Sequence, residues 1–362
     1  MKSRAMVLEA FNQPLVMREF DIQPLAEGEL LVKIEAAGVC GSDVHMQKGE
    51  DPRTPLPIIL GHEGVGRIVA MNGARKTVNG ETLAEGDLIL WTRGMACNHC
   101  YACAVLLEPW LCQDRKTYGI NRTSSQPPYL NGCYSEYVTL LNSVDIYKAA
   151  ADIDPAVLVS ASCSGATIAH AFDHHAPKLG DTVLVQGPGP LGLYAIMYAK
   201  KLGASRVIVI GGSGNRLEIC RDFGADVILN RNTTSVEERR QAILDLTYGR
   251  GVDMAIEAVG HPSAVQEGLK LVRSGGAYLS VGFSQPPGEC QVDFFKEVVS
   301  KNLKIQGVWV SSNRHTQHAL SMVQSQPELF AKMITHRFPL AEANAALQSM
   351  AQRDALKAVL IP

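Results

Sequence analysis

Four cysteines fall within one short stretch, and thiols at this spacing can hold a metal, form disulfides or carry redox chemistry. The stretch MACNHCYACAVLLEPWLC runs from Met95 and contains Cys97, Cys100, Cys103 and Cys112. Taken alone it leaves five possibilities open: a disulfide framework, a redox pair, an iron–sulfur site, a zinc knuckle for nucleic acid, or a structural metal site in a larger fold. The rest of the chain must decide among them.

The composition weakens several of these possibilities. With 362 residues the chain can form two domains that each bury a core without disulfides. Nine cysteines, an odd number, and a start (MKSRAMVLEAF) without a signal-like apolar stretch lead us to expect a reducing, cytoplasmic setting. Lys and Arg total 34 against 36 Asp and Glu, with no basic run, so no nucleic-acid partner is expected. The chain contains no uninterrupted stretch of about 18 apolar residues, so no membrane span is expected.

A second set of possible metal donors is scattered along the chain. Cys40 lies in GVCGSDVH, His62 in GHEGVG and Cys163 in SASCSGAT. A single cysteine or histidine is more often a core residue than a ligand. Two thiolates and one imidazole, however, form a set suited to a catalytic Zn²⁺ whose fourth position stays open to water or substrate. We therefore expect a second metal site built from these three residues.

The segment VLVQGPGPLG predicts a dinucleotide-binding turn. Gly187, Gly189 and Gly192 have the spacing G-x-G-x-x-G, directly after a predicted strand and at the start of a predicted helix. The first glycine permits the tight turn, the second lets the backbone approach a pyrophosphate, and the third lets the helix pack on the sheet. A purely structural glycine turn is the weaker interpretation in this context.

The segment expected at the cofactor ribose lacks the acidic residue that is typical of NAD-binding versions of this motif. Gly211, Gly212 and Ser213 occupy that place. Without the acid a 2′-phosphate is not repelled, and Ser213 or Arg216 can bind one. The sequence therefore leans slightly to NADP and leaves NAD open. Replacing Gly211 by Asp is expected to shift the preference toward NAD.

The order of predicted elements places these motifs in two kinds of domain. The first third, with segments such as LLVKIEAAGVC and GDLILWTRG, predicts short strands broken by turns. From about residue 181, strands rich in Val and Ile alternate with helical segments, as in a parallel sheet covered by helices on both faces. We predict an α/β fold, with a mostly-β catalytic domain at residues 1–164 and 307–362. A doubly wound Rossmann coenzyme domain is expected at residues 165–306.

The chain resembles the zinc-dependent medium-chain dehydrogenases of the alcohol dehydrogenase family over essentially its full length. The resemblance rests on four features: the GHEGVG block, the four-cysteine loop, the order of the scattered ligands and the glycine turn. The resemblance implies a GroES-like catalytic domain and NAD(P)-dependent conversion of a primary, secondary or cyclic alcohol to an aldehyde or ketone. It implies two zinc ions per chain, one of them structural on the four-cysteine set, since four thiolates leave no position for water. It also implies a homodimer or homotetramer in which NLKIQGVWV pairs across a dimer.

The resemblance assigns roles around the catalytic zinc, whose ligands correspond to Cys40, His62 and Cys163. Ser42 and His45 match the hydroxyl and imidazole of a proton relay. Asp43 matches the carboxylate that orients the ligand histidine, and Glu63 matches the acid beside that histidine. Besides the three turn glycines, the residues expected at the cofactor are Thr167, Pro190, Leu191, Gly211, Ser213, Arg216, Val259, Gly282 and Phe283.

The motifs do not define the substrate pocket. The candidates to line or gate it are Trp91, Arg93 and the stretch GEDPRTPLP with Glu50, Asp51 and Arg53. Two other functions stay open: a non-enzymatic binding or structural relative of the same fold, and a zinc-free quinone reductase of the same superfamily. Measured zinc content separates these readings, because about two ions per chain favours the dehydrogenase, one favours the structural site alone, and none favours the reductase.

Overall fold

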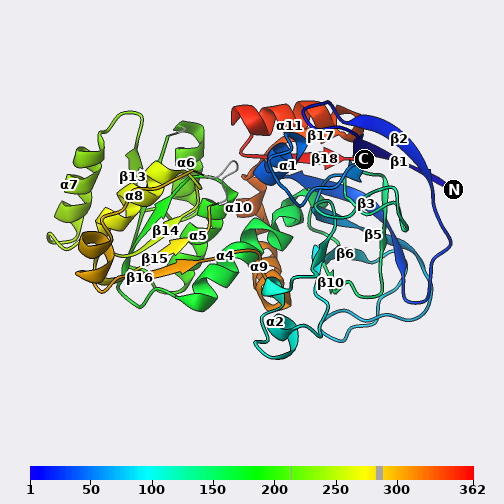
Figure 1. Ribbon diagram of the computed structural model, residues 1–362, viewed down its shortest axis with the longest axis horizontal. Coiled ribbons are helices and arrows are strands. Elements are labelled where there is room, and N and C mark those ends of the chain that lie inside the picture. Colours follow the sequence, from blue (N-terminus) through cyan, green and yellow to red (C-terminus); the bar gives the residue numbers. More distant parts are fainter. Residues whose placement is uncertain (213, 283–287) are drawn as a thin grey trace. The chain divides into compact units, whose positions relative to one another are not determined.

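The computed structural model describes residues 1–212, 214–282 and 288–362 (Figure 1). The chain divides into two compact units, whose boundaries lie a few residues from the predicted ones at 164/165 and 306/307. Unit 1 comprises Met1–Ala166 and Ser311–Pro362, and unit 2 comprises Thr167–Val310. In the described residues no single helix is long and apolar enough to cross a membrane. One bent pair, residues 155–162 and 164–174, meets that test by length and composition only.

Unit 1 is mostly β-structure. Its largest sheet has the strand order β10-β6-β5-β3-β18-β17, with β9 also paired to β3, and two small sheets have the orders β2-β1-β4 and β7-β8. The strands are β1 (Lys2–Leu8), β2 (Val16–Asp21), β3 (Leu30–Val39), β4 (Ile58–Ile59), β5 (Glu63–Met71), β6 (Leu88–Trp91), β7 (Gly94–Met95), β8 (Lys116–Thr117), β9 (Tyr137–Leu140), β10 (Ile146–Lys148), β17 (Ile334–Pro339) and β18 (Lys357–Ile361).

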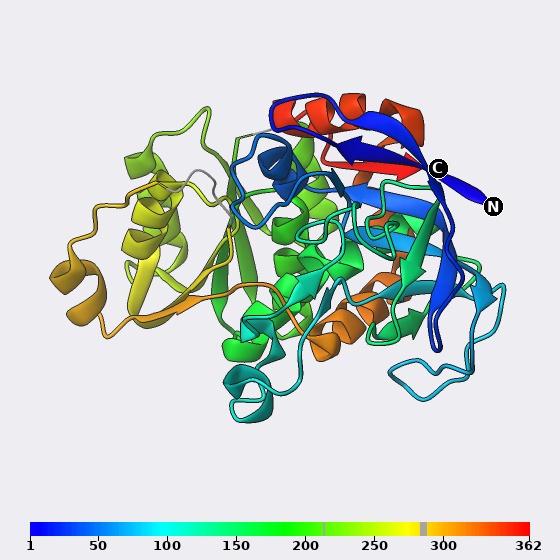
Figure 2. The same ribbon diagram turned by 45° about the vertical axis from the view of Figure 1, so that its right-hand side comes forward.

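Short helices connect these strands. They are α1 (Gly41–Gln47), α2 (Tyr101–Ala104), η1 (Pro109–Leu111), α3 (Pro155–Leu158), η2 (Val159–Ser162), α9 (Asn313–Ser325), α10 (Pro327–Ala331), η4 (Leu340–Glu342) and α11 (Ala343–Gln352). Helix α4 (Ser164–His174) begins in unit 1 and continues into unit 2. Segments from both ends of the chain lie together, because β18 pairs with β3 and α11 packs beside α1 (Figures 1 and 2). The core of unit 1 therefore combines residues from the first and last parts of the sequence.

Unit 2 contains a six-stranded parallel sheet of order β13-β12-β11-β14-β15-β16. Strand β11 is buried along its whole length, as expected for a parallel strand covered on both faces (Figure 1). The elements are β11 (Thr182–Gln186), α5 (Pro190–Lys201), β12 (Arg206–Gly211), α6 (Gly214–Asp222), β13 (Val227–Asn230), α7 (Val236–Leu246), β14 (Val252–Glu257), α8 (Pro262–Leu271), β15 (Val272–Ser280), η3 (Phe295–Val299) and β16 (Lys304–Gly307). The strand order reverses between β11 and β14, so the glycine turn after β11 lies at the switch point where such sheets bind ligands.

Candidate active site and metal centres

Neighbouring strands of unit 1 bring the scattered donors together. Strands β3 and β5 pair antiparallel with Gly38 opposite Glu63, so Cys40 follows the end of one strand and His62 precedes the start of the other. Cys163 follows η2, which packs against both strands. One donor atom from each of Cys40, His62, Glu63 and Cys163 lies within 4.8 Å of the others. The sequence places these residues far apart, and the sheet register explains why they meet.

The donor set fits a tetrahedral zinc ion in residue type and spacing. His62 Nε2 and Cys163 Sγ are 3.5 Å apart, and both side chains are buried. Two thiolates and an imidazole are ligands that zinc prefers in catalytic sites. Sulfur and nitrogen atoms at this separation can share one ion without rearrangement of the strands, so the described residues fit the group.

Asp43 holds the other side of the His62 ring. Its Oδ1 lies 3.3 Å from His62 Nδ1, and its Oδ2 accepts hydrogen bonds from Cys40 N at 2.8 Å and from Tyr134 Oη at 3.0 Å. Asp43 is the third residue of α1, and Cys40 caps that helix. A carboxylate on Nδ1 leaves Nε2 to face the donor set. Tyr134, which the motifs did not indicate, fixes the carboxylate from the opposite side.

The close packing of these buried groups shifts the pKa values of the donor residues. Burial alone would lower the pKa of His62, but the Asp43 carboxylate and the Cys40 thiolate raise it to about 9. A hydrogen bond between Cys40 and Cys163 holds the pKa of Cys40 well below its ordinary value and raises that of Cys163 well above its own. Metal binding at this set must therefore displace protons from both the imidazole and a thiol.

Glu63 belongs to the donor group and also to a buried ion pair. Its Oε2 lies 2.5 Å from Lys357 Nζ, and both residues are at most 2 % exposed. Lys357 begins β18, which pairs with β3 beside Gly38. A Cβ at Gly38 would lie 2.3 Å from Glu63 Oε2, so glycine leaves room for the pair. Burial alone would lower the pKa of Lys357, but Glu63 and Cys40 raise it. No sequence motif indicated a role for Lys357.

The predicted proton-relay residues lie on α1. His45 Nδ1 is 2.6 Å from Glu50 Oε2, and both side chains are about one quarter exposed. Ser42 is half-buried, and the described residues include no hydrogen-bond partner for it. Glu50 was expected to line or gate the pocket, and its contact with His45 gives it a more specific position. Asp51, from the same stretch, is buried and pairs with Arg53 at 2.5 Å.

Two further pocket candidates lie in and beside β6. Trp91 is 2 % exposed and packs in the core of unit 1. Its ring fills the space beside Gly64, where a Cβ would lie 2.5 Å from Trp91 Cζ2. This packing favours a core role over the expected pocket role. Arg93 is also buried, but its Nη1 donates to Cys163 Sγ at 2.9 Å. Arg93 therefore reaches the candidate metal centre itself.

The four clustered cysteines form a second donor set. One sulfur from each of Cys97, Cys100, Cys103 and Cys112 lies within 4.8 Å of the others. The backbone N–H groups of Cys97 and Cys100 donate to Cys112 Sγ and Cys97 Sγ, both at 3.3 Å. Hydrogen bonds to the Cys100 sulfur from the Cys103 backbone and from the neighbouring thiols lower the pKa of Cys100 to about 7. Four sulfurs gathered in this way fit a closed structural zinc site. In both views the loop with α2 projects from the sheets of unit 1 (Figures 1 and 2).

The glycine turn of unit 2 has the shape that its spacing predicts. Gly187 has φ +107°, and a Cβ at Gly192 would lie 1.9 Å from Gly187 O, so both positions require glycine. Gly189 caps α5, Pro190 begins that helix, and nothing lies within 4 Å of a Cβ at Gly189. The backbone there is open to an approaching ligand. Leu191 follows in the first turn and is half-buried.

Other expected cofactor residues surround this turn. Val259 Cγ2 lies 2.9 Å from the position of a Cβ at Gly187, and a Cβ at Gly282 would lie 2.1 Å from Gly260 N. Glu257, which the motifs missed, accepts from Val259 N and Gly260 N at 2.6 Å each and so fixes the loop after β14. Thr167 is buried in α4. Ser213 and Phe283 lie outside the described residues.

The end of β12 differs from the sequence-based expectation. A Cβ at Gly211 would lie 2.6 Å from Pro188 Cγ, so an aspartate there would clash with the glycine turn. The expected gain of NAD preference from that substitution is therefore not a sound test. A Cβ at Gly212 would lie 2.8 Å from Arg231 Nε. Arg231 thus lies beside the C-terminal end of β12, and the half-buried Arg216 follows in the first turn of α6.

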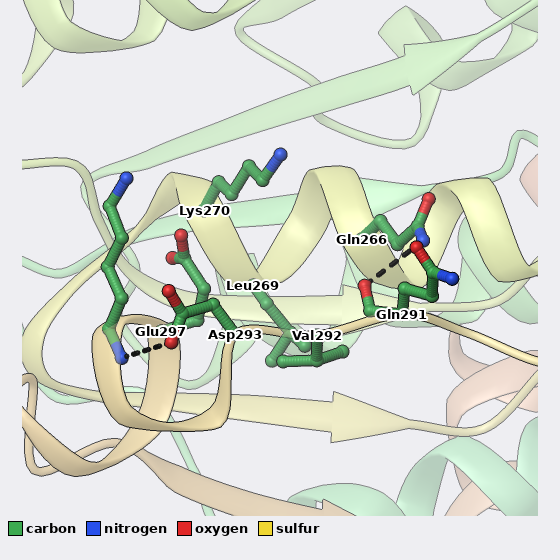
Figure 3. Close-up of a pocket in the computed structure, with 8 residues that line it drawn as sticks. Gln266, Leu269, Lys270, Gln291, Val292, Asp293 and Glu297 are labelled. Atoms are coloured by element: carbon green, nitrogen blue, oxygen red, sulfur yellow. Dashed lines mark hydrogen bonds between the residues drawn. The ribbon is translucent and has the colours of Figure 1, made fainter.

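Unit 2 also contains a cavity of about 180 Å³, and Figure 3 shows its lining. Gln266 Nε2 donates to Gln291 O at 3.1 Å across it, and Lys296 N donates to Asp293 Oδ1 at 3.0 Å (Figure 3). The lining residues are Gln266, Leu269, Lys270, Gln291, Val292, Asp293, Lys296 and Glu297. This cavity contains no residue of either donor set or of the glycine turn, so we do not assign the chemistry to it.

Comparison with known proteins gives concordant results. A family model described as zinc-binding dehydrogenase matches residues 190–325, and one described as alcohol dehydrogenase GroES-like domain matches residues 26–151. The chain is 32 % identical to 5-exo-hydroxycamphor dehydrogenase of Pseudomonas putida over 92 % of each chain. It is 29 % identical to L-threonine 3-dehydrogenase of Bacillus subtilis strain 168 over 96 % of this chain and 95 % of that one.

Solved structures agree with these sequence matches. An alcohol dehydrogenase from Thermotoga maritima is 51 % identical with a TM-score of 0.97, and all of each chain is covered. A zinc-binding dehydrogenase from Sinorhizobium meliloti 1021, solved bound to NADP, is 25 % identical with a TM-score of 0.87, again over all of each chain. The predicted α/β fold, with a GroES-like domain and a Rossmann domain, is confirmed.

Proposed function

Since the chain belongs to the zinc-dependent medium-chain dehydrogenases of the alcohol dehydrogenase family, we propose that it transfers hydride reversibly between a small alcohol and NAD(P). The product is the corresponding aldehyde or ketone. The observation that carries the proposal is the meeting of Cys40, His62 and Cys163 donors within 4.8 Å in unit 1. The relatives named above act on different alcohols, so their names alone do not give the substrate.

Zinc bound by Cys40, His62 and Cys163 would supply a Lewis acid that lowers the pKa of the substrate hydroxyl. Asp43 keeps Nε2 of His62 directed at the centre, since its carboxylate lies 3.3 Å from Nδ1. Glu63 stays paired with Lys357 at 2.5 Å, so its negative charge is balanced. These residues hold the centre in shape, and a bound nicotinamide would supply the hydride acceptor.

The hydroxyl proton leaves through side chains of α1 in this proposal. Ser42 accepts the proton and His45 passes it toward solvent, a role suited to a partly exposed imidazole. Glu50 supports the step, because its carboxylate lies 2.6 Å from His45 Nδ1 and stabilises the protonated ring. Replacing Glu50 by Gln should lower kcat most at low proton-acceptor concentration, and added imidazole buffer should restore part of the rate.

The four-cysteine loop holds a second, structural zinc ion in this proposal, giving two ions per chain. The closed set of four sulfurs and the hydrogen bonds to them support this role. The nine cysteines, six of them in the two donor sets, fit a reducing compartment such as the cytoplasm. A homodimer or homotetramer formed along the edge strand β16 remains our assembly proposal. Size-exclusion chromatography with light scattering at micromolar concentration would refute it by showing a monomer.

For the cofactor we propose a slight preference for NADP. No acidic side chain follows β12 at Gly211 or Gly212, and Arg231 and Arg216 lie near that end. Replacing Arg231 by Ala should lower kcat/KM for NADP about tenfold and leave that for NAD unchanged. Replacing the exposed Arg240 of α7 by Ala is the matched control. Equal losses with both cofactors would show that Arg231 does not read the 2′-phosphate.

Zinc analysis combined with activity tests the proposal against its two rivals. Purified protein should contain about two zinc ions per chain and oxidise members of a panel of primary, secondary and cyclic alcohols. Replacing Cys163 by Ala should remove one ion and abolish turnover, while NADP or NAD still binds. Replacing Cys133, a buried thiol outside both donor sets, by Ala should change neither. Turnover in the Cys163→Ala protein would refute the catalytic-zinc assignment, and intact zinc without any turnover would favour the non-enzymatic relative.

A further inference from the structure

Two arginines of unit 1 bring positive charge to the proposed catalytic centre. Arg93 directly precedes β7 and Arg115 directly precedes β8, and these strands pair antiparallel. Arg93 Nη1 donates to Cys163 Sγ at 2.9 Å. The Arg115 side chain lies against Gly94, where a Cβ would be 2.3 Å from Arg115 Nε. The two guanidinium groups are thus neighbours, and one of them contacts a proposed metal ligand.

The charges of these arginines are poorly compensated. In the described part of the chain, neither Arg93 nor Arg115 pairs with a carboxylate, and Arg93 Nε and Arg115 Nη1 are buried without an acceptor. The Arg115 side chain donates from Nη2 to Ser311 O at 3.3 Å. Burying charged donors without acceptors is costly, so a negatively charged partner is expected.

The Cys163 thiolate alone does not balance the charge of the Arg93 guanidinium. With a divalent ion bound, the two thiolates of Cys40 and Cys163 and the metal together carry no net charge, so nothing remains to balance a guanidinium. Other acids near the centre already have partners, because Glu63 pairs with Lys357 and Asp51 pairs with Arg53. Arg115 lies beside Cys112, whose four-thiolate zinc set would carry a net negative charge, so the guanidinium left without a balancing charge at the proposed substrate site is that of Arg93.

We propose that the substrate carries an anionic group, a carboxylate or a phosphate, close to the hydroxyl that is oxidised, and that Arg93 binds this group. This inference rests on the proposed function, since it assumes that the hydroxyl is held at the Cys40, His62 and Cys163 centre. Arg93 Nη1 touches a sulfur of that centre, so atoms bonded to the carbinol carbon come within its reach. A guanidinium offers paired N–H donors that match carboxylate and phosphate oxygens.

The first test uses the unmodified zinc-loaded protein and pairs of alcohols that differ only in charge. Lactate, glycerate and 3-hydroxybutyrate, both enantiomers of each, are compared with their amides, and glycerol 3-phosphate is compared with glycerol. We expect kcat/KM to be about 10- to 100-fold higher for the charged member of at least one pair. The carboxylate and phosphate arms show which anion the site takes. Equal or better turnover of the neutral members would overturn the anion inference and leave the dehydrogenase proposal standing.

The second test is whether Arg93 binds the anionic group of the substrate. In the Arg93→Gln protein the ratio of kcat/KM for the charged member to kcat/KM for the neutral member should fall to about 1. The control is Arg18→Ala, which removes an exposed arginine paired with Glu9 elsewhere in unit 1. Equal losses for charged and neutral members, or loss of zinc, would mean that Arg93 only positions Cys163, and the inference would be wrong.

A binding measurement separates the anion inference from the proposed function. Calorimetric titration of the zinc-loaded protein with lactate and with lactamide requires no turnover. Binding of the acid at least about tenfold tighter than the amide, lost in Arg93→Gln, would support the subsite even if no alcohol in the panel is oxidised. In that event the dehydrogenase proposal fails for short hydroxy compounds. Equal affinities for acid and amide would overturn the anion subsite whatever the activity.

Discussion

Replacing Lys357 by Met should destabilise unit 1 strongly. Lys357 Nζ lies 2.5 Å from Glu63 Oε2, and the two side chains are 2 % and 0 % exposed. Methionine keeps the volume and removes the charge, so Glu63 becomes a buried carboxylate without its counter-charge. Removing one partner of such a pair costs about 3–5 kcal/mol. A domain whose free energy of unfolding is about 5–15 kcal/mol would lose about a fifth or more of its stability.

Two comparisons test whether the unpaired Glu63 carboxylate causes the loss of stability in Lys357→Met. The double variant Lys357→Met with Glu63→Gln no longer buries an unpaired charge and should recover at least about 2 kcal/mol of the loss. Lys148→Met removes a pair with Asp87 that is formed at the surface, with a Lys148 side chain 39 % exposed, and should cost less than about 1 kcal/mol.

The assay is urea unfolding at pH 7 with excess zinc, followed by tryptophan emission, since Trp91 is 2 % exposed in the core of unit 1. The midpoint should fall for Lys357→Met while the m-value, which reports the surface exposed on unfolding, stays unchanged. A single variant within about 1 kcal/mol of wild type, or a double variant no more stable than the single one, would refute the reasoning.

Three further outcomes are expected. Cys100→Ser should lower the zinc content by about one ion and reduce the melting temperature, with activity lost only as unit 1 unfolds; a stable but inactive variant would contradict a structural role. Gly192→Ala should weaken cofactor binding far more than Gly189→Ala, because a Cβ would lie 1.9 Å from Gly187 O at the first position and within 4 Å of nothing at the second; fluorescence titration with NADPH and NADH checks this. The Arg4 guanidinium holds the pKa of Glu136 below its ordinary value of 4.5, so the ion pair contributes stability above that pH and loses it as the pH falls through the folded-state pKa. The unfolding free energies of wild type and Glu136→Gln, measured with urea from pH 7 to pH 3, should therefore converge at the acid end. A difference that stays constant over this range would argue against the linkage.

Motifs predicted the parts of the molecule in which spacing along the chain determines geometry. The turn glycines and the four clustered cysteines are local, so their sequence spacing already fixes which atoms meet. Cys40, His62 and Cys163 lie far apart in sequence; their residue types predicted a shared metal site, and the resemblance to a family supported it. The residues that sequence reasoning missed are held by long-range pairing: Lys357 reaches Glu63 only because β18 pairs with β3, and Tyr134 reaches Asp43 across the core.

Steric detail was equally inaccessible from the sequence. Gly211 was interpreted by the charge it lacks, whereas the structure shows that Pro188 leaves no room for any side chain there. Trp91 and Arg93 are two residues apart and were considered equally good pocket candidates. The first fills the core beside Gly64 and the second contacts Cys163. Neither difference follows from residue type, because both depend on which way a side chain leaves the backbone.

The pairing of β18 with β3 has a consequence for biosynthesis. Unit 1 is interrupted by residues 167–310, so a ribosome that has finished Ala166 must add nearly two hundred further residues before Lys357 emerges. At about 5–20 residues per second this takes roughly 10–40 s. During that time the nascent chain carries residues 37–39 of β3 without their partner strand and Glu63 without its counter-charge. Unit 2 can fold first as an independent block, and the catalytic donor set acquires its final surroundings only when translation is almost over.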